Sequence, residues 1–251
     1  MSGTARSRTA QPQALWISHR GACATATENT AEAFRAARAR GFTHLETDLR
    51  STVDGELVLA HDRNLRRISD WDLDVCESTR EQLAEVRLNG GEALLFFDQF
   101  LPEFADVHWI FDIKPEQGMR TLDTLFDWWQ KPDWREFFKR RVRLLLWDKR
   151  QQQYLLERHP EAVCLASVSE CRRAGVACLL GLPVFGGIEP GKTYALPPRL
   201  GGINLMRPAM IARFRRYGGR VLSYLPETED DVRHSLAVGV DEVLTNHDII
   251  E

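Results

Sequence analysis

The sequence has few of the features that mark secreted, membrane-spanning or disulfide-rich proteins. Its five cysteines are an odd number without CxxC spacing, which favours reduced thiols in a cytoplasm. No apolar run approaches the roughly 18 residues of a membrane span. Residues 1–13 are polar and lack the apolar stretch of a secretory signal. We therefore expect a cytoplasmic protein without a membrane span, in which residues 1–13 form a flexible tail.

An excess of charge of one sign is also missing. The chain carries 33 basic and 36 acidic side chains, for a net charge of −3. Proteins that bind nucleic acid generally carry a basic face, so we expect no nucleic-acid partner. Hydrophobic residues make up 43% of the 251 residues and charged residues 27%, the mix of an ordinary globular protein. A chain of this size can bury a core without disulfides.

What the sequence does contain is alternation of strand-like and helical segments. An α/β barrel needs about 250 residues, and eight strands alternating with helices predict a parallel sheet closed into a single-domain (β/α)₈ barrel (TIM barrel) over residues 14–251. An open doubly wound sheet is the alternative, and residues 168–200 are too rich in Gly and Pro for elements to be assigned. The eight predicted strands are Ala14–Ser18, His44–Val53, His108–Ile113, Val142–Trp147, Ala162–Ala166, Gly202–Leu205, Val221–Leu225 and Glu242–Thr245.

Several helices are predicted from their ends. Asn29 or Thr30 can cap a helix that ends at Gly41. The Ser-x-x-Glu pattern at 78–81 predicts a capping box. Thr228 is expected to begin the last helix, because acidic residues follow it in the first turn.

The second predicted strand carries a pair of carboxylates on one face. Side chains alternate along a strand, so Glu46 and Asp48 share one face, while Leu45, Thr47 and Leu49 share the other. In a barrel, the apolar face meets the helices and the charged face points inward. Two buried carboxylates are costly unless a cation neutralises them, so the pair predicts a metal site. The alternative is an exposed edge strand with a solvated charged face.

A histidine is expected beside this pair. Asp54–Gly55 suits a two-residue hairpin turn, and this register places His61 opposite Asp48. Directly opposed residues have Cβ atoms about 4.5–5.5 Å apart. His61 is therefore a candidate acid or base, although a lone histidine is more often a packed or surface residue.

Two further strand ends carry candidate site residues. His19, Arg20 and a glycine follow the first strand, and Arg20 offers a planar donor fork for phosphate. On the third strand, Asp112 and Lys114 take the inward face. Asp112 is a candidate third metal ligand, and Lys114 can hold a phosphate oxygen. The alternatives are a solvated arginine at a turn and an Asp112–Lys114 pair that satisfies itself.

Residues 186–193 match the P-loop pattern G-x-x-x-x-G-K-[ST]. A P-loop must lead into a helix whose N-terminus faces the phosphates, and the prolines at 197 and 198 forbid that helix. We expect no nucleotide site here, but a loop at the mouth of the barrel that contacts the substrate.

Six short motifs, in their order and spacing, resemble those of the glycerophosphodiester phosphodiesterase family. The motifs are dense between residues 19 and 62, residues 239–246 resemble the family's closing strand, and residues 115–220 match in rhythm only. The motifs are His19-Arg20-Gly21, Glu28-Asn29-Thr30, Glu46-Thr47-Asp48, Thr52-Val53-Asp54-Gly55, His61-Asp62 and Asp112-Ile113-Lys114.

This resemblance implies a TIM-barrel hydrolase that uses one divalent cation, Mg²⁺ or Ca²⁺. It also implies that two histidines act as general acid and base on a small-molecule glycerol phosphodiester. The implied roles are catalysis for His19 and His61, metal binding for Glu46, Asp48 and Asp112, and phosphate binding for Arg20 and Lys114.

Four positions depart from the family pattern. Asp112 stands where the family usually has Glu, and Thr27 replaces a common Pro. Tyr224 replaces a common Trp, and Asn246 replaces the usual Asp. Both histidines are retained. The changes at 112 and 224 bear on metal preference and substrate fit.

The expected function is metal-dependent hydrolysis of glycerophosphodiesters to glycerol 3-phosphate and an alcohol. One alternative is a phospholipase-D-like phosphodiesterase acting on lysophospholipids or other diesters, with Phe185, Tyr194 and Leu196 lining an apolar mouth. An alternative of another class is a non-catalytic barrel that binds a metal or a phosphate ligand. The intact His19 and His61 argue against it, because a binding protein does not need an acid–base pair.

Overall fold

The computed structural model describes residues 13–247, and the predicted tail over residues 1–13 therefore lies almost wholly outside the described residues. Eight parallel strands form one curved sheet in the order β6-β5-β4-β2-β1-β11-β10-β7. Their bounds are β1 Leu15–His19, β2 His44–Ser51, β4 His108–Ile113, β5 Val142–Leu146, β6 Val163–Cys164, β7 Thr193–Leu196, β10 Arg220–Tyr224 and β11 Glu242–Thr245.

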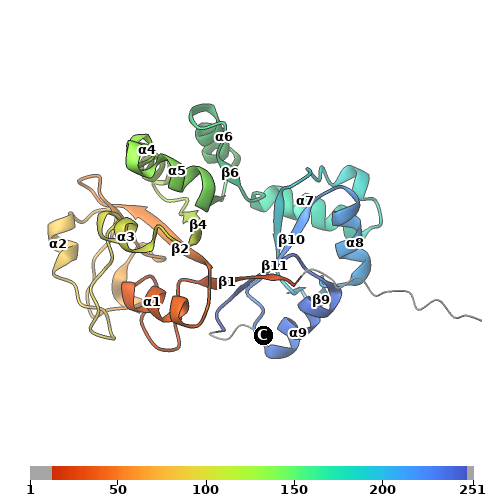
Figure 1. The fold of residues 1–251 in the computed structure, drawn as a ribbon, viewed down its shortest axis with the longest axis horizontal. Helices are drawn as coiled ribbons and strands as arrows, with labels where there is room; N and C mark the ends of the chain where they lie inside the picture. Colours follow the sequence, from red (N-terminus) through yellow and green to blue (C-terminus); the bar gives the residue numbers. More distant parts are fainter. Residues whose placement is uncertain (1–12, 248–251) are drawn as a thin grey trace, which may run out of the picture.

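The sheet closes almost completely into a barrel. No strand ladder joins β6 to β7, but the backbone N–H of Ala166 donates to the carbonyl of Thr193 at 2.9 Å. Helices lie around the outside of the strands, as Figure 1 shows. The predicted (β/α)₈ barrel is thus confirmed, and the open doubly wound sheet is not.

The helices follow the strands in the expected alternation, with an extra segment between β2 and β4. That segment contains β3 (Leu57–Leu59), which pairs antiparallel with β2, then the 3₁₀ turn η1 and two helices. The helices and 3₁₀ turns are α1 Ala31–Ala39, η1 Leu65–Arg67, α2 Arg80–Ala84, α3 Phe97–Phe104, α4 Gly118–Gln130, α5 Pro132–Arg141, α6 Lys149–Arg158, α7 Val168–Leu179, η2 Pro183–Phe185, α8 Pro208–Arg216 and α9 Glu229–Val238.

The sixth barrel strand lies elsewhere than the sequence predicts. We expect it at residues 202–205, but β7 occupies Thr193–Leu196. Residues 203–204 instead form β9, which pairs with β8 (Arg199–Leu200) in a separate two-stranded ribbon. The reason is that β7 is only four residues long and ends directly before two prolines, so its segment resembles a loop.

Two of the predicted helix starts are confirmed, and one is displaced. The side chain of Thr30 accepts from the backbone N–H of Ala33, and Thr228 caps α9 in the same way. The predicted capping box at 78–81 lies one residue later, where Thr79 and Gln82 exchange hydrogen bonds. Thr79 and Ser78 are both good capping residues, and the three-residue spacing to Gln82 suits the motif equally well.

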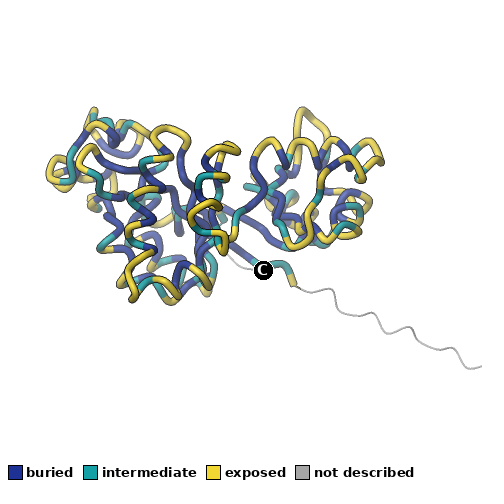
Figure 2. Tube along the Cα trace, turned by 90° about the horizontal axis from the view of Figure 1, so that it is seen from above, coloured by how far each residue is buried: buried dark blue, intermediate teal, exposed yellow. Residues whose placement is uncertain are grey.

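The main core lies between the outer faces of the strands and the helices. Leu45 and Leu49 of β2 and Phe111 of β4 are fully buried there, in one cluster with Phe34 and Phe100 of the flanking helices. A smaller apolar layer fills the barrel interior, formed by Ile17, Ile110, Leu165, Leu222 and Leu244. Figure 2 shows the buried segments inside and the exposed ones on the outer helices and loops.

Within residues 13–247, no helix is long and apolar enough to cross a membrane. All five cysteines carry free thiols.

Candidate active site

The strand register brings the predicted site residues to the same end of the barrel. His19 lies beside Glu46 where β1 pairs with β2. Asp48 lies beside Asp112 where β2 pairs with β4. The strands are parallel, so these positions lie toward their carboxyl ends, where the sites of such barrels are found.

Three carboxylates meet there. Glu46, Asp48 and Asp112 are all buried, with exposed fractions of 2%, 0% and 3%. Each offers one oxygen, and these oxygens lie within 4.8 Å of one another. A cation bound at the usual distances to oxygen, about 2.0–2.6 Å, allows its ligands to lie up to about 5 Å apart. The group therefore has the spacing of a Mg²⁺ or Ca²⁺ site.

Two basic side chains contact the carboxylates. The Nζ atom of Lys114 lies 2.7 Å from Asp48 Oδ1 and 2.6 Å from Asp112 Oδ2. Arg20 Nε lies 2.9 Å from Asp48 Oδ2. Lys114 thus bridges two carboxylates instead of forming a self-contained pair with Asp112. Arg20 is also shared with Glu28, so at least one negative charge of the three carboxylates has no lysine or arginine partner.

That unpaired charge affects Glu46 most. Burial raises the pKa of Glu46 well above its ordinary value, and Asp48 and Asp112 raise it further. Burial also acts on Asp48, but Lys114 and Arg20 lower the pKa of its carboxyl below the ordinary value. Glu46 is therefore the carboxyl that gains most from an added positive charge. The donor set and this charge imbalance fit a divalent cation.

His19 is held in a fixed orientation. Its Nδ1 lies 2.6 Å from Asn246 Oδ1, and its Nε2 lies 3.8 Å from Glu46 Oε2. Burial and the neighbouring Arg20 lower the pKa of His19 to about 4. The ring is therefore neutral at pH 7, with Nδ1–H donating to Asn246 and a lone pair on Nε2.

His61 reaches the same end by a register that differs from the predicted one. The hairpin loop has three residues, Val53–Gly55, and Gly55 has φ +86°. Asp48 consequently faces Ala60, whose N–H donates to the Asp48 carbonyl at 3.1 Å, and His61 is the next residue. The prediction of a two-residue turn was wrong, because a glycine in the left-handed region can also close a three-residue loop with a bulge.

A chain of polar contacts connects His61 with the carboxylates. Its Nδ1 lies 2.7 Å from Asp62 Oδ1, and Asp62 pairs with Arg67. Arg67 lies 2.5 Å from Glu28, which in turn pairs with Arg20 at 3.2 Å. Glu28 of the Glu-Asn-Thr segment therefore helps to position the loop that carries His61.

Sequence reasoning missed two hydrogen bonds to the carboxylates. Asn29, considered above as a helix cap, donates from Nδ2 to Asp48 Oδ2 at 2.8 Å. Its φ of 59° is the left-handed conformation that asparagine adopts more readily than most residues. Trp147 donates from Nε1 to Asp112 Oδ1 at 2.7 Å. The one available signal for Trp147 was its position directly after β5.

Tyr224, at the end of β10, adds a hydroxyl near the carboxylates. Burial raises its pKa to about 12, and Glu46 and Asp112 contribute to the same shift. The hydroxyl therefore keeps its proton at neutral pH and can act as a hydrogen-bond donor.

The P-loop-like segment lies at the opposite end of the barrel. It precedes β7, and Gly191 N–H donates to the carbonyl of Gly218, which precedes β10. Lys192 is paired with Glu170 at 2.8 Å and with Glu189 at 3.2 Å. The segment leads into a strand, as the prolines require, so the absence of a P-loop helix is confirmed. The expectation that it contacts substrate at the barrel mouth was wrong, because the loop joins a helix to the amino end of a strand.

We predict that Asn246→Ala lowers kcat about 10–100-fold, the usual effect of losing a hydrogen-bond partner that orients a site residue. The reason is that Asn246 Oδ1 accepts the hydrogen bond from His19 Nδ1–H and so fixes the orientation of the ring. Asn246→Asp keeps an acceptor oxygen and should retain activity. Steady-state kinetics with the melting temperature of each variant check this. Equal losses for both substitutions, without loss of stability, would contradict an orienting role.

Comparisons with known proteins agree with this geometry. The barrel superposes on the glycerophosphoryl diester phosphodiesterase domain of a Mycobacterium tuberculosis protein with a TM-score of 0.79, 17% identity and coverage of 94% of this chain and 97% of that one. A glycerophosphodiester phosphodiesterase from Agrobacterium tumefaciens gives a TM-score of 0.71 with 18% identity, over 94% of this chain and 97% of that chain. At these identities, the structural likeness shows the fold alone.

Similarity in sequence identifies the family to which the chain belongs. The chain is 25% identical over 230 residues to "Probable glycerophosphodiester phosphodiesterase 2" of Mycobacterium tuberculosis, covering 87% of this chain and 81% of that protein. Human glycerophosphodiester phosphodiesterase 1 is 40% identical over only 70 residues, 28% of this chain and 21% of that protein. The model of the "Glycerophosphoryl diester phosphodiesterase family" matches residues 19–181, well over half of the sequence. The chain therefore belongs to the glycerophosphoryl diester phosphodiesterase family of hydrolases.

Proposed function

We propose that this protein hydrolyses glycerophosphodiesters to glycerol 3-phosphate and an alcohol, with one divalent cation and two histidines. The observation that carries the proposal is the cluster of Glu46, Asp48 and Asp112, buried beside His19 at the strand ends of a barrel of this family. A buried cluster with an unpaired negative charge has no evident structural purpose, since it destabilises the folded protein unless a cation binds.

In this proposal, Glu46, Asp48 and Asp112 hold Mg²⁺ or Ca²⁺. When bound, the cation supplies positive charge that polarises the phosphoryl group. Asp112 has a shorter side chain than the usual glutamate, but Lys114 and Trp147 fix both of its oxygens. A fixed aspartate loses less conformational freedom on binding an ion, which offsets its shorter reach.

Arg20 and Lys114 would bind the phosphate of the substrate. Both are already held by carboxylates, at 2.9 Å for Arg20 and 2.6–2.7 Å for Lys114. Such preorganised donors stabilise developing charge without having to reorient during the reaction. Their side chains are largely buried, with exposed fractions of 13% and 6%, which strengthens these interactions.

The two histidines would divide the proton transfers. One accepts the proton of the nucleophile, and the other donates a proton to the departing alkoxide. The ring of each is oriented through Nδ1, by Asn246 for His19 and by Asp62 for His61, so Nε2 is the atom that transfers the proton. Water or the 2-hydroxyl of the glycerol can serve as the nucleophile, and the latter would release a cyclic phosphate first.

The direct test is a panel of glycerophosphodiesters assayed with and without EDTA. We predict release of glycerol 3-phosphate and the free alcohol, loss of activity in EDTA, and recovery on addition of Mg²⁺ or Ca²⁺. The reason is the charge imbalance around Glu46. Metal binding without turnover of any diester would favour the non-catalytic alternative, and full activity in EDTA would rule out the metal's role.

We also propose a cytoplasmic location and a small-molecule substrate. The free thiols of all five cysteines support the first. The burial of the carboxylate cluster supports the second, because a macromolecular substrate would need a more open site.

A further inference from the structure

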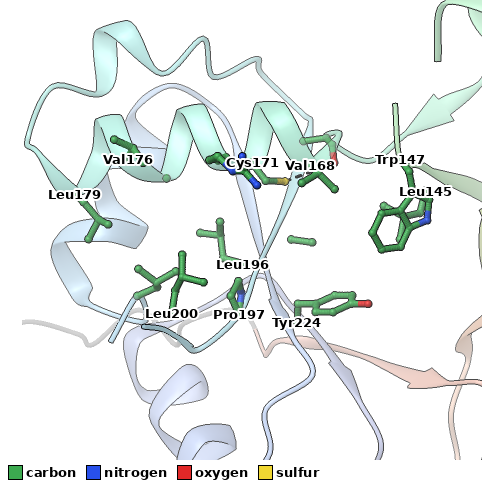
Figure 3. A pocket seen from close by; sticks show the side chains of 15 residues that line it. Leu145, Trp147, Val168, Cys171, Val176, Leu179, Leu196, Pro197, Leu200 and Tyr224 are labelled. Atoms are coloured by element: carbon green, nitrogen blue, oxygen red, sulfur yellow. Dashed lines mark hydrogen bonds between the residues drawn. The ribbon is translucent and has the colours of Figure 1, made fainter. Parts of the chain in front are cut away.

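An apolar cavity of about 330 Å³ lies along α7, next to the gap in the barrel wall. It is bounded by α7 on one side and by β7 and the β7–β8 segment on the other (Figure 3). Ala166, whose N–H donates to the carbonyl of Thr193 at the edge of β7, lines it. The cavity thus occupies the place where a full β6–β7 ladder would otherwise close the barrel.

Small residues keep this space open. Ala166 lines the cavity from the segment between β6 and α7, Gly175 from α7 and Ala195 from β7. A Cβ atom on Gly175 would have Leu196 Cδ2, at 3.8 Å, as its nearest neighbour, which is an ordinary contact. Close packing therefore does not require this glycine, although glycine is unfavourable inside a helix. The sequence leaves an apolar space unfilled at some cost to the helix.

The inner end of the cavity adjoins the candidate active site. Trp147 lines the cavity and donates its indole N–H to Asp112, a proposed metal ligand. Tyr224 also lines it and lies close enough to Glu46 and Asp112 for their charges to raise its pKa. Figure 3 shows both aromatic side chains at one end of the cavity. Both side chains therefore lie between the carboxylates of the candidate active site and the apolar cavity.

The outer end opens to solvent between apolar residues. Val176 and Leu200 line the cavity at this end and are 50% and 62% exposed. Among the described residues that line it, only Arg172 is charged, and its side chain is exposed. A polar headgroup would therefore find few partners here, whereas an aliphatic chain would replace water against apolar walls.

The lining differs from the sequence prediction of an apolar mouth. Of the three residues named, only Leu196 lines the cavity. Tyr194 points to the outside of the barrel, where its ring packs on that of Phe214 with 5.2 Å between the ring centroids. Phe185 lies in η2 beyond the end of α7 and is 72% exposed. Side chains alternate along β7, so Tyr194 and Leu196 lie on the same face of the strand. Leu196 is the last residue of β7 and lies beside the cavity, whereas Tyr194 lies further from it.

We infer that this cavity holds an aliphatic chain of the substrate, so that the preferred diester carries one hydrocarbon chain on one of its two esterified alcohols. The inference rests on the proposed function. A methylene group fills roughly the volume of a water molecule, about 30 Å³, so the cavity accommodates about ten carbons. The chain lies along α7, and the phosphodiester lies beyond Trp147 and Tyr224, at the carboxylates.

Two substrate series test the inference and identify the esterified alcohol that carries the chain. In the first, ethyl, hexyl, decyl and tetradecyl esters of glycerol 3-phosphate carry it on the leaving alcohol. In the second, monoacyl glycerophosphoethanolamines of matched lengths carry it on the glycerol. All are used below the concentration at which they aggregate. In the series that carries the chain on the correct alcohol, kcat/KM should rise about two- to fourfold per methylene up to about ten carbons and then level off. The series that shows this rise identifies the alcohol.

A pair of variants at Gly175 separates the cavity from other effects. Gly175→Leu fills the space beside Leu196, and Gly175→Ala is the matched control that changes the helix in the same way but adds only one methyl group. Gly175→Leu should abolish the preference for long chains and keep kcat/KM on the ethyl ester. Gly175→Ala should keep both. The melting temperatures of both should equal or exceed that of the parent protein, because glycine is replaced inside a helix.

The outcomes distinguish this inference from the proposed function. If the ethyl ester is hydrolysed and neither series shows a chain-length dependence, the inference is wrong and the proposed function stands. If no diester is hydrolysed, the proposed function fails, and the inference is then tested by the binding of alkylphosphonates. In that case decylphosphonate should raise the melting temperature of the metal-loaded protein more than ethylphosphonate does, and Gly175→Leu should remove the difference. Equal shifts in the parent protein would overturn the inference.

Discussion

Replacing Glu46 by glutamine should abolish the stabilisation of the protein by divalent cations and lower kcat/KM by more than about a hundredfold. Even a residue that only hydrogen-bonds to a metal ligand typically costs about 10–100-fold in metal affinity or activity when it is replaced, and Glu46 is proposed as a ligand itself. The fold should remain intact. Burial and two neighbouring carboxylates already favour the uncharged form of Glu46, and the amide has the same shape without the charge. The metal-free variant should therefore melt at or above the temperature of the metal-free parent.

The measurement is the melting temperature with and without saturating Mg²⁺ or Ca²⁺, together with kinetics. At about a hundred times Kd, an ion that binds only the folded protein should raise the melting temperature of the parent by about 5–10 °C. Glu116→Gln is a control, since it removes one carboxylate near the same end, where Glu116 pairs with Arg50 at 3.3 Å. This control should keep the metal-dependent shift. A variant at 46 that responds to metal like the parent would contradict the assigned ligand.

The alternation along β2 was sufficient to predict which of its side chains face the centre of the candidate site. An inward face with Glu46 and Asp48 and an outward face with Leu45 and Leu49 follow from the two-residue period of a strand. Parallel strands then bring Asp112 to the same end, whatever the exact shape of the barrel. This part of the site depends on local periodicity and on strand direction, which the sequence specifies directly.

The contacts that orient these side chains could not be predicted in the same way. Trp147 and Asp112 are 35 residues apart, and Asn246 and His19 are 227 residues apart. Such contacts depend on which strands become neighbours and how far each extends. Residues this distant meet only once the whole barrel has closed, so no local pattern marks them.

The two errors of strand and loop assignment have a common physical origin. β7 is short and ends at prolines, and the hairpin loop contains a glycine that adopts φ +86°. In both places, several backbone arrangements satisfy the local sequence, and tertiary packing selects one. At β7, the selecting contact is the burial of Tyr194 against α8. At the hairpin, it is the ladder between Leu49 and Leu59, both fully buried.

The contacts of Asp112 support the metal-ligand role that we propose for this short side chain. Asp112 Oδ2 contacts Lys114 and its Oδ1 accepts from Trp147, so the short side chain is held at both oxygens. Trp147 thus has two functions in our proposals: it orients a metal ligand on its polar edge and forms the wall of the apolar cavity with its ring. Changes at this position should therefore affect metal binding and chain preference together.

The histidines give the second large effect. His19→Ala and His61→Ala should each lower kcat about 10²–10⁴-fold, the usual contribution of a positioned proton carrier. Divalent-cation binding should barely change, because neither histidine is assigned as a ligand. His44→Ala is a matched control, since His44 lies at the amino end of β2, stacked on His108 at 4.4 Å and away from the carboxylates. It should leave the rate per folded molecule unchanged.

The leaving group separates the two roles. p-Nitrophenolate leaves without being protonated, so the variant that lacks the general acid should recover much of its rate on a p-nitrophenyl diester. The variant that lacks the general base should remain slow on both alkyl and aryl diesters, because its nucleophile is still not activated. The same pair of substrates therefore assigns the acid and the base to His19 and His61. If both variants lose activity equally on the two substrates and also lose the cation, the histidines are metal ligands, and the division of proton transfer proposed here is wrong.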